Sequence, residues 1–214
     1  MWPCMTHDLW VFGYGSLMWH PGFPAVEAVR AELRGFHRAL CIYSTKYRGT
    51  SAHPGLVFGL DLGGFCEGMA FRVAAEHASE TIRYLRDREQ VTGVYRAEMR
   101  LVQLHGPQSH TLRALTFVSN RQHRQYAGML PIAKQVEIVR ASHGVSGPNA
   151  DYVRNTASHM REIGIQDQRI ERLAVLLGRS SHSQSKAQTY TRRLVPQLPT
   201  ASALRSGYFR NIGL

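Results

Sequence analysis

One stretch, residues 9–19, constrains the fold of this chain more than any other, and it reads LWVFGYGSLMW. Its first four residues form a short apolar run that is typical of a buried strand. Gly13 and Gly15 then let the backbone turn sharply and approach a ligand closely, because glycine has no Cβ. Successive N–H groups in such a turn can form a concave anion site, and Tyr14 and Ser16 add two hydroxyls beside it. The stretch therefore predicts a core strand that ends in a tight loop, and such a loop is more often structural than functional.

Three functional motifs are excluded at this loop. A dinucleotide-binding fingerprint needs a third glycine and a helix that starts in the loop, and neither is expected here. A phosphate-binding loop needs a lysine, which is absent from the stretch. A serine-hydrolase elbow needs Gly-x-Ser-x-Gly, and the second glycine is missing after Ser16, so Ser16 is a poor nucleophile candidate.

Apolar periodicity divides the following chain into a strand-rich part and a helical part. Strands are expected within residues 26–43, where Gly35 separates two of them, and as two hairpins, 55–61 with 65–73 and 94–104 with 111–119. The first hairpin is expected to turn at residues 62–64. Residues 26–34 also fit a helix face, although we favour a strand there. Helices are expected at residues 76–88, 131–143, 150–163 and 168–177. Strands followed by helices are typical of an α+β fold.

Length and composition predict one globular domain of 214 residues with ample chain for a core. No apolar run reaches the ~18 residues that a membrane helix needs, and no secretion signal is expected at the N-terminus. Cys4, Cys41 and Cys66 are an odd number of cysteines without close spacing. This usage argues against a disulfide framework and favours a cytoplasmic location. The eleven histidines are scattered and no Cys-x-x-Cys occurs, so no metal site is predicted.

The net charge of +11 is concentrated at the end of the chain. Residues 179–214 hold six Lys or Arg and no acidic residue, so they carry +6 and the rest of the chain +5. A basic tail can bind nucleic acid. Because this tail is rich in Ser, Gln and Arg and lacks periodicity, we expect a flexible, solvated appendage instead. The sequence thus predicts a globular domain at residues 1–178 and a tail at 179–214.

Three segments resemble, in the same order, the signatures of the ChaC family, the glutathione-specific gamma-glutamylcyclotransferases. They read VFGYGSLMW, then YLRDRE followed by TG and Tyr95, and then GVSGPNADYV. The resemblance runs from residue 9 to about 178, with one mild departure, since family members usually have Pro where Val145 stands. It implies a small closed or nearly closed β-barrel with helices packed around it and a pocket at the barrel mouth.

The resemblance also implies the site residues. The catalytic residue is Glu89, and the γ-glutamyl group is held by the loop of Tyr14, Gly15, Ser16 and Leu17. Glu89 stands at the C-terminal end of an expected helix, where the helix dipole and burial in the barrel mouth both raise the pKa of a carboxyl. A raised pKa makes a carboxylate a better general base.

Three further positions are open to both a functional and a structural interpretation. Arg48 lies in a loop that is similar to an Arg-Gly loop of the family, and its guanidinium can bind a substrate carboxylate in bidentate fashion. Tyr152 either reaches the pocket or only packs. Asn149 is a residue type that caps helices well, and for it we favour a structural, packing role.

The implied reaction cleaves glutathione to 5-oxoproline and cysteinylglycine, a lyase reaction that needs no metal or cofactor. The substrate's own α-amine attacks its γ-carbonyl carbon, so the enzyme mainly holds a near-attack shape. One alternative is a cyclotransferase that acts on other gamma-glutamyl amines or dipeptides. The other is a non-catalytic binding domain whose basic tail contacts nucleic acid. Neither the oligomeric state nor the role of the tail follows from the sequence.

Overall fold

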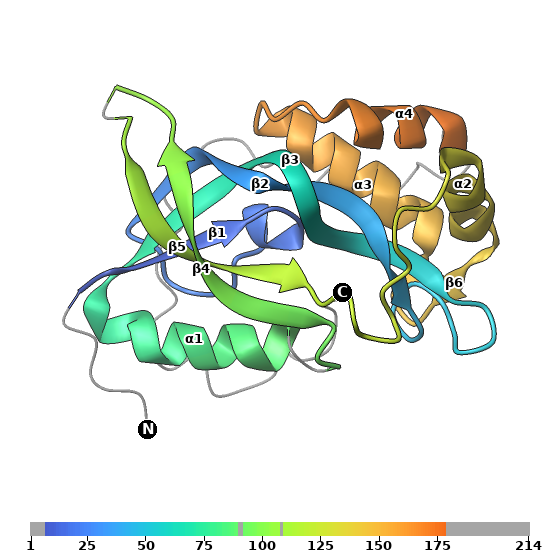
Figure 1. The fold of residues 1–214 in the computed structure, drawn as a ribbon, viewed down its shortest axis with the longest axis horizontal. Helices are drawn as coiled ribbons and strands as arrows, with labels where there is room; N and C mark the ends of the chain where they lie inside the picture. Colours follow the sequence, from blue (N-terminus) through green and yellow to red (C-terminus); the bar gives the residue numbers. More distant parts are fainter. Residues whose placement is uncertain (1–6, 90–91, 108, 179–214) are drawn as a thin grey trace.

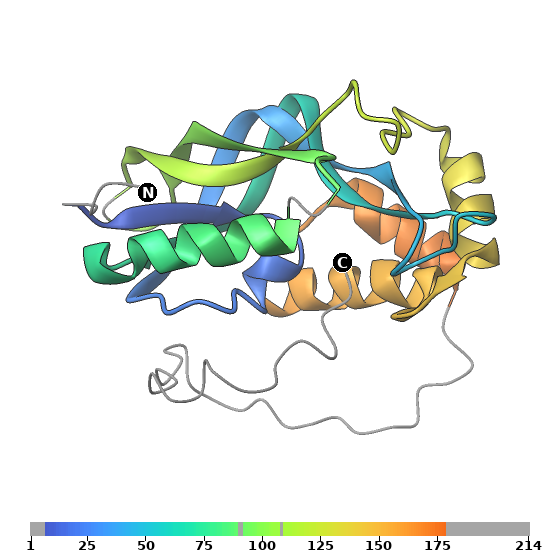
Figure 2. The same ribbon diagram turned by 90° about the horizontal axis from the view of Figure 1, so that it is seen from below.

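The computed structural model describes residues 7–89, 92–107 and 109–178 of the protein. Five strands form a closed barrel in the order β1-β3-β2-β4-β5, and helices pack on its outside (Figures 1 and 2). The barrel strands are β1 (Leu9–Gly13), β2 (Glu27–Ser44), β3 (Gly55–Val73), β4 (Tyr95–Leu104) and β5 (Thr111–Ser119). The predicted α+β class and the closed barrel are therefore confirmed.

The first strand closes the barrel. β1 pairs antiparallel with β3 over its whole length and parallel with β5 through Val11 and Leu115. Val11 and Phe12 are completely buried, as expected for an apolar run with neighbours on both sides. The prediction that residues 9–12 form a core strand is confirmed.

Strands β2 and β3 are longer than predicted, and two predictions about them are wrong. The chain does not break at Gly35, and residues 62–64 do not reverse it. Gly35 lies opposite Gly63 and Gly64 in the β2–β3 ladder, all three have positive φ, and the register shifts between Arg34 and Phe36. Bulged residues of this kind bend a strand without ending it. The chain reverses instead in the polar loop between Ser44 and Gly55.

All four predicted helices are confirmed to within two residues at each end. Helix α1 (Ala75–Glu89) follows β3 and lies along the barrel, whereas α2 (Ile132–Ala141), α3 (Asn149–Glu162) and α4 (Gln168–Leu177) gather at the other end of the molecule (Figure 2). The short strands β6 (His143–Gly144) and β7 (Gly147–Pro148) pair just before α3. Within the described parts of the chain, no helix is long and apolar enough to cross a membrane.

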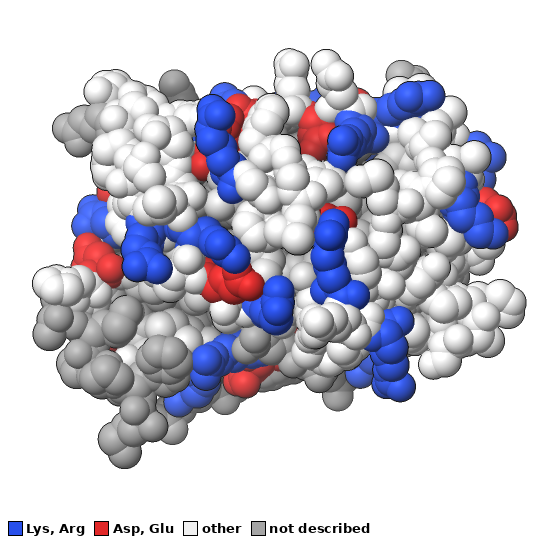
Figure 3. All heavy atoms as spheres, viewed as in Figure 1, with Lys and Arg blue, Asp and Glu red and all other residues white. Residues whose placement is uncertain are grey.

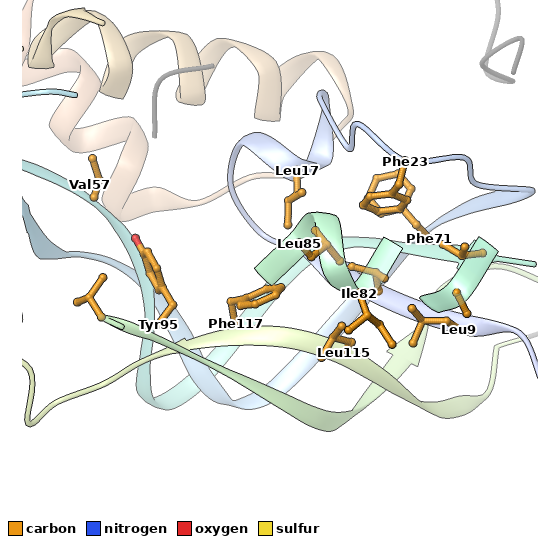
Figure 4. Close-up of a cluster of buried hydrophobic side chains, with 14 of the residues drawn as sticks. Leu9, Leu17, Phe23, Val57, Phe71, Ile82, Leu85, Tyr95, Leu115 and Phe117 are labelled. Atoms are coloured by element: carbon orange, nitrogen blue, oxygen red, sulfur yellow. The ribbon is translucent and has the colours of Figure 1, made fainter. Parts of the chain in front are cut away.

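The position of α1 is set by the apolar core of the barrel. Ile82 and Leu85 belong to the same buried cluster as Leu115 and Phe117 of β5 (Figure 4). Residues three and four apart share one face of a helix. Glu89 follows Leu85 by four residues, so the packing that buries Leu85 also turns Glu89 inward.

Asn149 has the structural role that we favoured, but it does not act as a helix cap. Pro148 occupies the N-cap position of α3, and the Asn149 side chain makes no capping hydrogen bond. Asn149 is the first helical residue, it is completely buried, and its amide bonds to the backbone of Leu56 in β3. Backbone groups that are buried in the interior need hydrogen-bond partners. The side-chain amide of Asn149 supplies one partner for the Leu56 N–H and another for the Leu56 C=O.

Candidate active site

A small pocket opens at one end of the barrel. Its walls come from the loop after β1, from the strands β3, β4 and β5, and from α1 and α3. The lining residues are Tyr14, Gly15, Ser16, Leu17, Val57, Phe58, Glu89, Tyr95, Phe117 and Tyr152. Six of the seven predicted site residues are therefore brought together in one pocket, at the predicted mouth of the barrel.

The loop after β1 folds back on itself as a short 3₁₀ helix, η1 (Ser16–Met18), which the sequence did not predict. The N–H of Met18 donates to the C=O of Gly15 at 2.9 Å. The first N–H groups of a helix have no partner inside it, so the N–H groups of Ser16 and Leu17 are not bonded within η1. Gly13 is required by this geometry, because a Cβ at that position would lie 2.9 Å from the Leu17 Cβ.

Glu89 is the titratable group of the pocket whose pKa falls near neutrality. Its side chain is 7% exposed. Burial raises the pKa of the carboxyl to about 7, and the Arg88 guanidinium beside it partly opposes this shift. Burial also raises the pKa of the Tyr14 and Tyr95 hydroxyls well above 10, so these groups stay neutral. Among the described lining residues, Glu89 is thus the one suited to exchange a proton at neutral pH.

Two tyrosines are fixed to one residue of β3. The Phe58 N–H donates to the Tyr152 hydroxyl at 3.2 Å, and the Tyr95 hydroxyl donates to the Phe58 C=O at 2.7 Å. The Tyr152 ring also lies 5.4 Å from the Phe58 ring. Tyr152 therefore both lines the pocket and packs, which unites the two interpretations that the sequence left open.

Arg48 is not among the residues that line this pocket. Its Nη1 donates to the C=O of Ser146 at 2.6 Å, and its guanidinium lies 5.3 Å from the Tyr152 ring. It stands beside Tyr152 and joins the loop after β2 to the segment before α3. Binding of a substrate carboxylate by Arg48 stays a prediction.

The sequence analysis missed a buried arginine that supports the loop. Arg38 of β2 is 3% exposed. Its Nε donates to the Tyr14 C=O at 2.5 Å, and its Nη1 pairs with the Asp167 carboxylate at 3.0 Å. Asp167 in turn caps α4 by accepting from the backbone N–H groups of residues 169 and 170. The one available signal was a charged residue placed inside an apolar strand pattern, which indicates a buried and paired side chain.

Arg88 was missed as well, although it precedes Glu89 in the sequence. Its side chain is 6% exposed, and its Nη2 donates to the Ser16 Oγ at 2.9 Å. Arg88 follows Tyr84 by four residues, so helical spacing alone would have placed it at the edge of the buried face. Its contacts to the loop after β1 span about 70 residues of sequence, which no local pattern reveals.

Metal binding has no candidate in the described residues, where no three His, Cys, Asp or Glu side chains lie close enough together to hold an ion. Cys41 and Cys66 are free thiols and are buried. Burial raises the pKa of each thiol to about 11. Both therefore remain protonated, and neither suits nucleophilic chemistry.

Comparison with known proteins points to one family. The family model of ChaC-like proteins matches residues 9–180. The chain is 32% identical over 167 residues to the glutathione-specific gamma-glutamylcyclotransferase of Escherichia coli. The matched residues cover 78% of this chain and 71% of that protein. It is 33% identical over 162 residues to the human glutathione-specific gamma-glutamylcyclotransferase 1, over 75% of this chain and 73% of that protein.

A solved structure agrees in fold. The crystal structure of a gamma-glutamylcyclotransferase specific to glutathione from yeast superposes with a TM-score of 0.73 at 21% identity, and covers 80% of this chain and 96% of that one. The barrel, the glycine loop after its first strand and the buried glutamate at the end of α1 thus occur in a sequence that matches one family model over most of its length. This chain belongs to the ChaC-like family.

Proposed function

We propose that this protein is a glutathione-specific gamma-glutamylcyclotransferase, which converts glutathione to 5-oxoproline and cysteinylglycine. One observation carries the proposal. The loop of residues 14–17 and a buried glutamate with a pKa of about 7 face the same pocket, in a chain whose relatives bear that name. The reaction needs a base that works near neutral pH and a site that folds the γ-glutamyl chain into a ring-forming shape.

Glu89 is the proposed general base and acid. The α-amine of glutathione is largely protonated at neutral pH, so it must lose a proton before it can attack. Glu89 accepts that proton, and the freed nitrogen forms a bond to the γ-carbonyl carbon. When the bond from that carbon to the cysteine nitrogen breaks, the attacking nitrogen also gives up its second proton. The cysteine nitrogen takes up this proton and the one that Glu89 returns, and it leaves as an ammonium group. The products are a five-membered lactam and a dipeptide, and water takes no part.

The loop after β1 is proposed to stabilise the developing negative charge. An oxygen that becomes an oxyanion needs donors already aimed at it, and the backbone N–H groups of Gly15, Ser16 and Leu17 are the candidates. Tyr14 and Tyr152 are proposed to shape the pocket around the γ-glutamyl chain. Their hydroxyls are neutral, so they can bind polar groups without adding charge beside Glu89.

Incubation with glutathione in oxygen-18 water tests the proposal directly. We expect unlabelled 5-oxoproline and cysteinylglycine, because the nucleophile comes from the substrate. Acetylation of the α-amine should abolish the reaction. Labelled glutamate as the main product would show hydrolysis and overturn the mechanism. A panel of other gamma-glutamyl amines and dipeptides, compared by kcat/KM, decides between glutathione and these alternatives.

The division into a catalytic domain at residues 1–178 and a tail at 179–214, with the domain in the cytoplasm, is part of the same proposal. The family match ends near the same point, and the tail lies outside the described residues. On the face seen in Figure 3, Lys and Arg side chains are spread out and several lie beside acidic ones. On this face the charges do not form the continuous basic surface that a nucleic-acid-binding module gathers.

A further inference from the structure

Arg88 connects the two walls of the pocket that the proposed mechanism uses. Its Nη2 donates to the Ser16 Oγ at 2.9 Å, and its Nη1 donates to the His20 C=O at 2.7 Å and to the Tyr84 hydroxyl at 2.9 Å. Its Nε lies 3.2 Å from the Glu89 Oε1, but this N–H makes no hydrogen bond. One buried guanidinium thus holds the loop after β1 against the last turn of α1.

The contact with Ser16 fixes what the serine hydroxyl can do. A guanidinium has only donors and keeps its charge at every relevant pH, so the Ser16 Oγ must accept from Arg88. The single proton of Ser16 is then available for an acceptor elsewhere, and Ser16 lines the pocket. The hydroxyl is therefore suited to bind a carboxylate or carbonyl oxygen of a substrate and unsuited to act as a nucleophile.

The contact with Glu89 acts on the charge of the base. A cation within a few ångströms favours the ionised carboxylate, whereas burial favours the neutral form. The other ionisable groups that face Glu89 are Tyr14 before η1, Tyr95 of β4 and Tyr152 of α3. Burial raises the pKa of each of these hydroxyls, so they do not titrate in the neutral range. Arg88 is the described charge that opposes the effect of burial on Glu89.

We propose that Arg88 is a positioning residue of the cyclotransferase reaction, which directs the Ser16 proton into the pocket and keeps the adjacent Glu89 carboxyl ionised in more of the molecules. The role in turnover rests on the function proposed above. The two effects are separable, because one depends on the forked geometry of the guanidinium and the other on its charge.

Two substitutions separate these effects. Arg88→Met removes both the charge and the fork, while Arg88→Lys keeps the charge but cannot reach Ser16, Tyr84 and His20 together. The matched control is Arg83→Met on the exposed face of the same helix, where the side chain is 73% exposed. The acid limb of the pH profile of kcat/KM and the titration of Glu89 are measured for each variant. The titration uses carbon-13 NMR of the glutamate carboxyls, with Glu89→Gln identifying the signal.

In Arg88→Met we expect the Glu89 midpoint and the acid limb to rise by roughly one pH unit or more. We expect kcat/KM at pH 7 to fall on the order of 100-fold, because the loop is no longer held in place. Arg88→Lys should keep the wild-type midpoint but remain impaired in kcat/KM. Arg83→Met should match the wild type in both measurements. An unchanged Glu89 midpoint in Arg88→Met would overturn the electrostatic role.

A double-mutant cycle tests the link to Ser16. Ser16→Ala should lower kcat/KM about tenfold in the wild type and much less when Arg88 is already Lys or Met, since residues that act together are not additive. Equal losses in all backgrounds would overturn the positioning role. If Arg88→Met does not fold, the double-mutant cycle of Ser16→Ala with Arg88→Lys still tests the positioning role. The NMR titration needs no turnover, so a wild type inactive on glutathione refutes the proposed function and leaves the electrostatic role testable.

Discussion

Asn149 pairs with the backbone of Leu56 through both ends of its side-chain amide. Its Oδ1 accepts from the Leu56 N–H at 2.6 Å, and its Nδ2 donates to the Leu56 C=O at 2.8 Å. The pairing attaches the start of α3 to β3, two residues before Phe58. Tyr152 follows Asn149 by about one helical turn, so the same attachment brings its hydroxyl to the Phe58 N–H.

Replacing Asn149 by Ala should destabilise the fold. Two buried backbone groups of Leu56 would lose their partners, and each such loss costs about 1–3 kcal/mol. We expect the free energy of unfolding to drop by about 2–4 kcal/mol in urea titrations. Asn155→Ala is the matched control, because Asn155 is exposed on the same helix. A loss of less than 0.5 kcal/mol would mean that water or a local shift replaces the amide.

The pH dependence of turnover should report the ionisation of Glu89. A general base works only when ionised, and burial raises the pKa of this carboxyl to about 7. We therefore expect kcat/KM to fall about tenfold per pH unit below that value and to lose this limb in Glu89→Gln. Turnover of Glu89→Gln should fall by roughly two to four orders of magnitude. Activity within tenfold of the wild type would remove Glu89 from the mechanism, and Glu80→Gln on the exposed side of α1 serves as the control.

Ionisation of the buried Glu89 carboxyl should also lower the free energy of unfolding at alkaline pH. The pKa of the carboxyl is about 7 in the folded chain and near its ordinary value of 4.5 when unfolded. Between these values the folded state binds more protons, so the free energy of unfolding falls as pH rises through this window. Glu89→Gln cannot ionise and should be more stable than the wild type at pH 8 by up to about 3 kcal/mol. The wild type and Glu89→Gln should have the same stability near pH 4. Thermal melts of both proteins at pH 4 and pH 8 check this expectation.

Deletion of residues 179–214 should leave cyclotransferase activity nearly intact, because the pocket residues all precede this segment. Any salt-sensitive association with nucleic acid should weaken, since the deletion removes six positive charges. Activity assays and filter binding at two salt concentrations measure both effects. Loss of the fold in the truncated chain, seen by circular dichroism, would show that the tail is part of the domain.

The order of the elements could be predicted from local pattern, but the shape of the longest strands could not. The sequence Leu62-Gly63-Gly64 has the composition of a hairpin turn, yet here it bends β3. Its partner is Gly35 on β2, almost 30 residues away, and only that pairing decides between a turn and a bulge. Local turn residues thus predict where a strand is irregular and not how the irregularity is resolved.

The candidate site divides in the same way. Six of the residues that line the pocket lie in short segments that resemble a known family, and they were predicted as site residues: Tyr14, Gly15, Ser16, Leu17, Glu89 and Tyr152. Val57, Phe58 and Phe117 line the pocket from strands outside those segments and were not predicted. Arg38 and Arg88 act through contacts to the loop of residues 14–21 from other elements, and no sequence pattern joins them to it. Buried arginines that hold a loop become visible only when the packing is known.

The closure of the barrel by Val11 and Leu115 has a consequence for the growing chain on the ribosome. The strand that carries the glycine loop is made first, but its parallel partner follows more than 100 residues later, and contacts so distant in sequence form slowly. The wall at Tyr152 is made later still. A nascent chain shorter than this has no complete pocket, so no partly synthesised product can carry out the proposed reaction. Enzymatic activity is therefore a marker of the finished domain, and its delay after translation measures the time of folding.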